Sequence, residues 1–365
     1  MKKSSIIKFS ILISIAAIFF YSFKYDSKST NSNKPKKVIF IIGDGMGLAQ
    51  ISGVMSIFDG RKSFERFPVI GLMKTHSSDN YITDSGAGAT VFSIGEKTYN
   101  GAIGVDKNEK AKENLFEKLK KKNWATGVVV TSSITHATPA CFYAHAASRS
   151  SAEDIAEFLL QGNCDIAVGG GMQYFTNRKD KRNLFAELQA KGFVTTSDTT
   201  SNFIPQNSSK YIYTLAADGM KKILQGRGDF LKQASLNAIQ NLSKNKNGYM
   251  LMIEGSQIDW GGHENNYEYM KTELLDLNDV INAVLDEAQK RDDLLVVVTS
   301  DHETGGLALN AHTTDKKKFI GNYSTKGHSG IMVPVFAFGP GANEFAGVYE
   351  NTEIFFKFKK LLNLK

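Results

Sequence analysis

Val38-Ile39-Phe40-Ile41-Ile42-Gly43-Asp44 is the stretch of this 365-residue chain that best indicates its fold. Its apolar residues do not alternate with polar ones, which is typical of a strand covered on both faces of a parallel sheet. Five more runs of this kind lie at Gly127–Val130, Asp165–Val168, Tyr249–Ile253, Leu294–Val298 and Ile331–Phe338.

Helical patterns fill the intervals between these runs. They lie near 46–58, 85–95, 113–122, 138–147, 152–162, 183–191, 229–244, 267–290 and 351–362, whereas 192–228 has no clear pattern. This alternation predicts an α/β fold with a doubly wound, mostly parallel central sheet and helices on both faces.

Polar residues follow most of the predicted strands. Asp44 follows the first, the segment from Thr131 to Thr138 the second, Glu254 the fourth, and Asp301-His302 the fifth. Open α/β sheets bind ligands beyond the carboxyl ends of their strands. We therefore expect a site at that edge, because four such sets are hard to explain as helix caps.

The first 37 residues are predicted to direct export. Residues 1–23 contain three early lysines and an apolar stretch from Phe9 to Phe23, and 24–37 form a polar linker. A stretch of fifteen residues is short for a bilayer span, which favours a cleaved signal peptide over a signal anchor, although no small-residue cleavage site is evident. The mature body, 38–365, is expected to be one domain located in the periplasm or outside the cell.

The charge of the chain is concentrated in this leader. The formal net charge is +7, and residues 1–37 hold eight lysines and one aspartate, so the body carries 36 basic and 36 acidic side chains. A specific nucleic-acid-binding body would show a basic stripe, and none is expected here. Membrane contact is expected only through the N-terminal segment, if that segment is retained.

The chain has two cysteines, Cys141 and Cys164. In an exported protein they could pair, but Cys141 lies in a predicted helix, where a buried free thiol is equally plausible.

An acidic residue and a serine enter a run of small residues in Thr83-Asp84-Ser85-Gly86-Ala87-Gly88-Ala89-Thr90. A helix starting at Ser85 would direct its free N–H groups at whatever the hydroxyl contacts. Ser85 is therefore either a nucleophile for an anionic centre or part of a capped helix with a tightly packed small-residue face.

Two pairs of residues suit metal ions. Asp259 and His263 are four apart and would share one side of a helical turn, although Gly261-Gly262 argue against a regular helix. Asp301 and His302 would point to opposite faces of a strand, so both reach one site only if the chain leaves strand geometry there.

Imidazole with carboxylate suits Zn²⁺, whereas carboxylate with hydroxyl suits Mg²⁺. Asp44, Thr138 and Glu254 fit the second set. Arg149, expected near the end of the 138–147 helix, offers a fork that matches phosphate, and a helix-end salt bridge is its alternative role. His328, between glycines, would by itself be taken for a surface loop residue.

Together these segments resemble the alkaline phosphatase family, in the family's order from Val38 to about Gly339. The matching segments are Ile41–Gly47, Asp84-Ser85, Thr135–Ala140 with Arg149, Gly169–Gly171, Glu254–Asp259, Thr299–Glu303 and Gly327-His328. The resemblance implies an alkaline-phosphatase-like fold and a hydrolase of small-molecule phosphate monoesters, with two zinc ions and one magnesium ion.

The resemblance also implies a role for each residue. Ser85 would be the nucleophile that forms a phosphoserine intermediate, and Arg149 would hold the phosphate oxygens. The first zinc would be held by Asp259, His263 and His328, the second by Asp44, Asp301 and His302, and the magnesium by Asp44, Thr138 and Glu254.

Two positions vary within the family. Some bacterial members have Asp and Lys where this chain has His136 and Trp260, residues that act on phosphate release and magnesium affinity through water. Only 25 residues separate His302 from His328, where larger members carry an insertion. A smaller interface between subunits is expected, and a homodimer remains a prediction.

Two other functions compete with this interpretation. A superfamily phosphodiesterase or sulfatase would act on a different ester, and Thr138, Glu254 and Arg149 favour monoesters over those substrates. A non-catalytic, metal-dependent phosphate-binding protein would need no nucleophile at Ser85.

Overall fold

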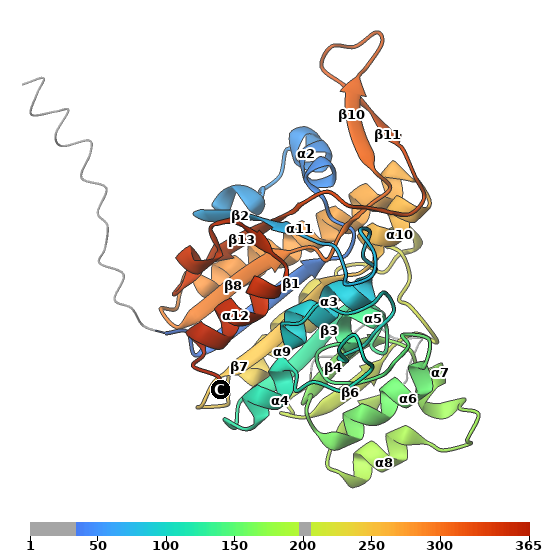
Figure 1. The fold of residues 1–365 in the computed structure, drawn as a ribbon, viewed down its shortest axis with the longest axis vertical. Helices are drawn as coiled ribbons and strands as arrows, with labels where there is room; N and C mark the ends of the chain where they lie inside the picture. The colour runs from blue at the N-terminus through green and yellow to red at the C-terminus, as the bar shows by residue number, and fades with distance from the viewer. Residues whose placement is uncertain (1–33, 197–205) are drawn as a thin grey trace, which may run out of the picture. The chain divides into compact units, whose positions relative to one another are not determined.

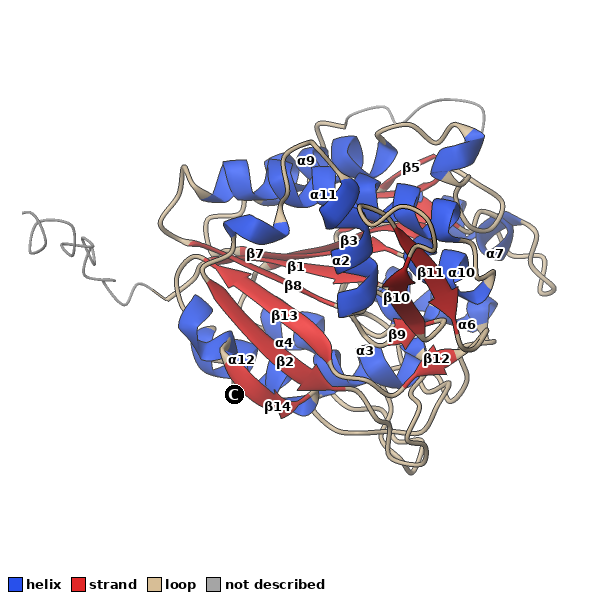
Figure 2. Ribbon diagram, turned by 90° about the horizontal axis from the view of Figure 1, so that it is seen from above, coloured by secondary structure: helices blue, strands red, loops and turns tan. Residues whose placement is uncertain are grey.

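The computed structural model describes residues 34–196 and 206–365. A ten-stranded sheet crosses the molecule in the order β14-β2-β13-β8-β1-β7-β3-β4-β6-β5 (Figure 2). Its strands are β1 Lys37–Gly43, β2 Val69–Lys74, β3 Ala125–Ser133, β4 Ile166–Gly170, β5 Val194–Thr196, β6 Tyr211–Thr214, β7 Tyr249–Gly255, β8 Leu294–Thr299, β13 Val333–Phe338 and β14 Gly347–Glu350. Seven neighbouring strands, β8, β1, β7, β3, β4, β6 and β5, are parallel.

Helices cover both faces of this sheet, as predicted (Figure 1). The α-helices are α2 Leu48–Ile57, α3 Ser85–Ile94, α4 Leu115–Lys120, α5 Ala137–Ala140, α6 Ala152–Glu157, α7 Gln173–Thr176, α8 Leu184–Ala190, α9 Phe230–Leu242, α10 Gln257–His263, α11 Tyr267–Ala288 and α12 Thr352–Leu361. Alternate residues of β1 enter two hydrophobic clusters: Phe40 packs with α3, α4 and α12, and Ile39 and Ile41 pack with α2, α9 and α11. The uninterrupted apolar run of β1 is thereby explained.

All six predicted strands are present, but two helix predictions need correction. The helix expected over 138–147 is only α5, and the chain then turns so that Ile103 and Ala146 pair in a β-bridge. The Asp259–His263 segment, in contrast, is the regular helix α10. Its glycines serve packing, because a Cβ on Gly261 would lie 2.6 Å from the Met270 nitrogen.

Two small sheets extend the carboxyl-end edge of the main sheet. β9 (Glu303–Thr304) pairs with β12 (His328–Ser329), and β10 (Leu307–Ala311) pairs with β11 (Phe319–Tyr323) in a hairpin that projects from the body (Figure 1). The sequence did not predict these four strands. They matter for the site because β12 carries His328 back to His302.

The two cysteines do not pair: both are free and buried. Cys141 lies just after α5, where its Sγ approaches the hydroxyl of Thr90 at 3.1 Å, and the Cys164 thiol donates to the Ile166 carbonyl at 3.1 Å. Burial raises the pKa of the Cys141 thiol to about 12, which makes it unreactive.

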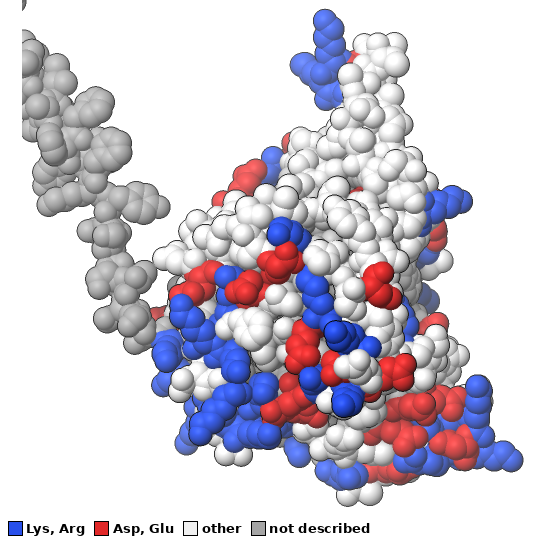
Figure 3. All heavy atoms as spheres, viewed as in Figure 1, with Lys and Arg blue, Asp and Glu red and all other residues white. Residues whose placement is uncertain are grey.

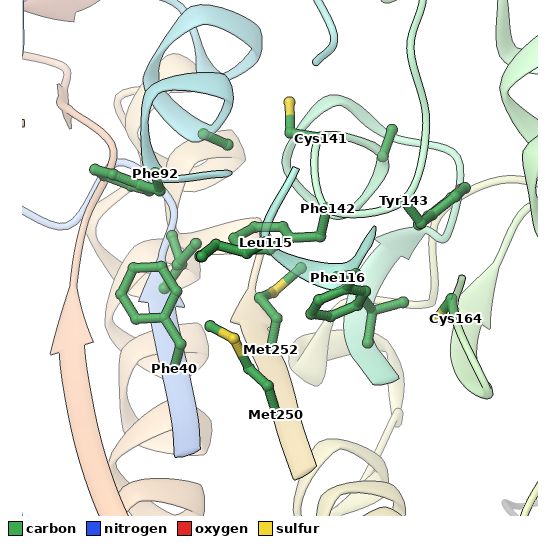
Figure 4. Packing of buried hydrophobic residues seen from close by; sticks show 14 of the residues in the cluster. Phe40, Phe92, Leu115, Phe116, Cys141, Phe142, Tyr143, Cys164, Met250 and Met252 are labelled. Atoms are coloured by element: carbon green, nitrogen blue, oxygen red, sulfur yellow. The ribbon is translucent and has the colours of Figure 1, made fainter. Parts of the chain in front are cut away.

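Phe40, a residue of β1, lies at the centre of a group of aromatic side chains on the face of the sheet that packs against α3 and α12 (Figure 4). Its ring centroid is 5.6 Å from that of Phe92, 6.1 Å from Phe142 and 5.3 Å from Phe358, all edge-on. We expect Phe40→Ala to lower the free energy of unfolding by about 3–5 kcal/mol, because the ring is fully buried among these neighbours. Denaturant titration checks this, and the exposed Phe356→Ala on α12 should cost far less.

Residues 34–365 form a compact unit that contains the whole sheet and both hydrophobic clusters, so we expect this unit to fold on its own. Within the described residues, no helix has the length and apolar character needed to cross a bilayer. The leader and most of the linker, residues 1–33, lie outside the described part of the chain.

Candidate metal and phosphate site

The predicted site residues converge beyond the carboxyl ends of β1, β3, β7 and β8. Asp44 directly follows β1, Glu254 is the penultimate residue of β7, and Asp301-His302 follow the end of β8. The departure from strand geometry that Asp301 and His302 require occurs after Thr299, as expected.

Ser85 is the first residue of α3, and its Oγ lies 3.3 Å from His302 Nε2. Asp84 caps the helix, because its Oδ1 accepts the Ala87 N–H at 2.9 Å and the Gly101 N–H at 2.9 Å. Burial opposes ionisation of Asp84, but the Ala87 N–H and Arg149 outweigh it and lower the pKa of that carboxyl. Ser85 thus begins a capped helix and has its hydroxyl beside a histidine. The capped helix start is confirmed, and the nucleophile role stays a prediction.

One potential metal group joins Asp44, Asp301 and His302, which is the predicted second zinc set. His302 Nε2 lies 3.2 Å from Asp301 Oδ2 and 3.5 Å from Asp44 Oδ1. Burial, with His328 nearby, holds the pKa of His302 well below its usual range. A neutral imidazole between two carboxylates is suited to bind a cation.

A second group contains the predicted first zinc set. His263 Nε2 lies 3.3 Å from Asp259 Oδ2 and 3.2 Å from His328 Nε2, and His328 Nε2 lies 3.5 Å from Asp259 Oδ1. The helix α10 places Asp259 and His263 one turn apart on the same side, and β12 brings in His328. The rings of His302 and His328 stack at 3.5 Å between centroids, so the two groups adjoin.

The third group brings Asp44 and Glu254 together with a ring nitrogen of His136. Glu254 accepts the Ser256 hydroxyl at 2.6 Å, and the buried hydroxyl of Thr138 on α5 has no hydrogen-bond partner in the part of the chain that the structure describes. Burial and Arg149 lower the pKa of His136 to about 4, so its ring is neutral. The sequence interpretation placed His136 outside the metal ligands, whereas here it lies close enough to be one.

The carboxylates in these groups are suited to bind divalent cations. Both carboxylate oxygens of Asp44, Oε1 of Glu254 and Oδ2 of Asp301 are buried and accept no hydrogen bond among the described residues. Burial raises the pKa of Glu254 to about 7 and, together with Asp259, that of Asp301 to about 6. Buried acceptors with like charge and no donors fit divalent metal ions, which would supply the missing positive charge.

Arg149 reaches the site from a turn rather than from the end of a helix, which corrects the prediction for its position. Its Nη1 donates to Asp84 Oδ2 at 2.8 Å, and its Nη2 lies 3.3 Å from His136 Nε2. The salt bridge with Asp84 directs the guanidinium across the start of α3. Arg149 therefore lies where an anion held near Ser85 would meet two N–H donors.

Trp260 completes the His136 side of the site. Its indole packs against Gly219, where a Cβ would lie 2.4 Å from the ring, and its centroid lies 6.2 Å from that of His136 at a steep angle. The packing role of Trp260 is thus present, and its effect on phosphate release or magnesium affinity stays a prediction.

Sequence reasoning missed Glu303 and Thr304, the residues after His302. The Thr304 hydroxyl donates to Asp259 Oδ1 at 2.5 Å. Glu303 is fully buried and accepts from Gln50 Nε2 at 2.6 Å, from the Gly306 and Leu307 N–H groups at 3.1 Å, and from the Ser329 hydroxyl. Glu303 belongs to the Thr299–Glu303 segment of the family resemblance, but its role was not predicted, because its partners come from α2, its own turn and β12.

We predict that Glu303→Ala weakens zinc binding by roughly 10–100-fold, since Glu303 connects the residues next to His302 and His328. Competition with a chromogenic chelator measures this directly, apart from turnover. Glu303→Gln keeps one acceptor oxygen and should lie between the two. Replacement of the exposed Glu268 on α11 by alanine is the control. Equal zinc affinity in the parent and in all three variants would show that Glu303 does not hold the zinc ligands in place.

Comparisons with known proteins agree with this geometry. The alkaline phosphatase family model matches residues 35–323. Alkaline phosphatase 3 of Bacillus subtilis is 32% identical over 90% of this chain and 89% of its own length. The alkaline phosphatase of the Antarctic bacterium TAB5 is 44% identical, with a TM-score of 0.88 over 91% of this chain and 99% of that one. A histidine-to-aspartate variant of the TAB5 enzyme, 45% identical with the same TM-score and coverage, was solved with magnesium bound in its M3 site.

Proposed function

The chain belongs to the alkaline phosphatase family and is a phosphomonoester hydrolase, and from that premise we propose that it acts through a phosphoserine intermediate on Ser85, with two zinc ions and one magnesium ion. The observation that carries the proposal is the position of the Ser85 hydroxyl, 3.3 Å from His302 Nε2 at the start of a buried, capped helix.

The residues would divide the reaction between them. Ser85 Oγ attacks phosphorus as the ester P–O bond breaks and the alcohol leaves, and water then cleaves the phosphoserine to release inorganic phosphate. Arg149 and the free N–H groups of α3 would orient the phosphoryl oxygens. The bound metals would supply Lewis-acid charge that lowers the pKa of the Ser85 hydroxyl and stabilises the leaving oxygen.

Each metal would be held by residues that the fold already groups. We propose zinc at Asp259, His263 and His328, zinc at Asp44, Asp301 and His302, and magnesium at Asp44, Thr138 and Glu254. The magnesium in the M3 site of the TAB5 variant supports a third metal in this family. His136 lies beside the proposed magnesium ligands Asp44 and Glu254. It would either bind the same cation or contact phosphate through water, and Trp260 packs beside it.

The rival activity is hydrolysis of phosphodiesters or sulfate esters. Arg149 and the bound metals would favour a phosphate monoester, because at alkaline pH its dianion carries twice the negative charge of a phosphodiester or a sulfate ester. We therefore expect p-nitrophenyl phosphate to be cleaved much faster than bis-p-nitrophenyl phosphate or p-nitrophenyl sulfate at alkaline pH. Faster turnover of either rival ester would overturn the monoesterase proposal.

Location and assembly complete the proposal. The leader supports export to the periplasm or the cell exterior, either by a cleaved signal or by a retained anchor. A homodimer is proposed as well, and sedimentation of the purified protein tests it.

A further inference from the structure

The amino ends of six of the seven neighbouring parallel strands form a basic end of the molecule, which we call the amino pole. It consists of the segments that lead into β1, β3, β4, β6, β7 and β8, namely 34–36, 120–124, 161–165, 206–210, 244–248 and 289–293. These segments hold ten lysines and arginines and only three aspartates. Figure 3 shows basic side chains gathered at the end of the molecule that carries α4 and α12.

The opposite end has the reverse composition. The five residues that follow each of the same strands include no lysine or arginine and five carboxylates: Asp44, Asp218, Asp259, Asp301 and Glu303. Because residues 38–365 carry equal numbers of basic and acidic side chains, this separation is not a consequence of net charge. The metal ions proposed at Asp44, Asp259 and Asp301 would offset much of this negative charge. The charge asymmetry of the body therefore comes from the lysines and arginines gathered at the amino pole.

Several lysines of the amino pole have no carboxylate partner. Lys37 pairs with Asp293 and Lys120 with Asp165, both within 2.7 Å. Among the described residues, in contrast, no ion pair involves Lys34, Lys36 or Lys246, and all three side chains are exposed. Their charges are free to meet an anionic partner.

We propose that the amino pole docks on an anionic lipid surface, with the active site facing away from the membrane. The described chain begins at this pole, at Lys34. Ten residues, 24–33, separate it from the apolar stretch that ends at Phe23, and they span at most about 36 Å. If that stretch is retained in a bilayer, the lysines are held near the headgroups, where basic side chains bind anionic lipid.

The charge separation gives the docking an orientation. A negative surface attracts the amino pole, whereas the segments that follow the same strands offer it no lysine or arginine, so the body should stand with its strands directed away from the bilayer. Soluble phosphate esters would then reach the site without crossing the headgroup layer.

The test uses residues 34–365, so that the leader cannot bind the membrane itself. We expect cosedimentation with phosphatidylglycerol vesicles, none with phosphatidylcholine vesicles, and loss of binding in about 1 M NaCl, where charges are screened beyond about 3 Å. The triple variant Lys34→Gln, Lys36→Gln, Lys246→Gln should bind roughly 100-fold more weakly. Its turnover of p-nitrophenyl phosphate should be unchanged.

The matched control replaces Lys316, Lys317 and Lys318, in the turn between β10 and β11, by glutamine and should bind like the parent. Equal binding of the triple variant and the parent would overturn the proposal, as would binding to neutral vesicles or weaker binding only in the control. If the protein bound soluble polyphosphate as tightly as phosphatidylglycerol vesicles, the partner would be a soluble polyanion and the lipid proposal would be wrong. If the parent protein failed to hydrolyse p-nitrophenyl phosphate, the vesicle-binding result would still stand, because cosedimentation does not depend on the proposed reaction.

Discussion

Ser85→Ala is expected to lower kcat/KM for p-nitrophenyl phosphate on the order of 10⁵-fold, the scale seen when a catalytic nucleophile is removed. The change deletes one hydroxyl and leaves the cap intact, because Asp84 supplies the acceptor for Ala87 and Gly101. The variant should therefore fold and still bind metal. Steady-state kinetics give the loss, and acid-quenched reactions with labelled phosphate should show covalent label in the parent only.

Ser93 provides the matched control for this prediction. It is buried on the same helix, but its hydroxyl donates to the Thr90 carbonyl at 3.0 Å. Ser93→Ala should thus keep turnover within a few-fold. If Ser85→Ala retained the parent rate, the covalent mechanism would be wrong, and a phosphate-binding protein would be supported if neither protein turned over substrate.

The central sheet was predictable from sequence because its strands are buried on both faces. A short continuous apolar run such as Leu294–Val298, rich in β-branched valine, favours a buried strand over a buried helix segment. The strands that were missed, such as β2, β6 and β14, are short, and two of the three alternate or lie partly exposed. Their existence depends on neighbours far away in sequence, which a local pattern does not encode.

The site was predictable in its ligand types and less so in its geometry. The family resemblance identified Asp259, His263 and His328 as ligands. The glycines at 261 and 262 suggested an irregular helix, but the helix is regular, and the absence of side chains at these glycines leaves room for Met270 and Thr304. Glu303 could not be foreseen, because its four donors come together only when α2 and β12 meet. The turn that carries Arg149 follows from the β-bridge between Ile103 and Ala146, another long-range contact.

Chelation with EDTA is expected to abolish turnover, and Zn²⁺ with Mg²⁺ should restore it, because the catalytic edge concentrates buried carboxylates with unpaired oxygens. Differential scanning calorimetry gives a second measurement. In the metal-free protein, burial and neighbouring carboxylates raise the pKa of Asp44, that of Asp301 to about 6 and that of Glu254 to about 7. The folded state then holds protons that the unfolded chain has released.

A folded-state pKa above the unfolded one stabilises the protein at low pH, and this contribution is lost as pH rises through the folded value. These carboxylates should accordingly lower the Tm of the metal-free protein as pH rises from about 5 to about 8. The lowered pKa values of His136 and His302 contribute a slope of the opposite sign over this range. With metals bound the slope should reverse, because acid protonates the ligands and releases the ions. Asp44→Asn removes one charge shared by two of the groups, so it should flatten the metal-free slope and weaken the metal-dependent rise in Tm. A Tm unaffected by metal across this range would show that these carboxylates hold no cation.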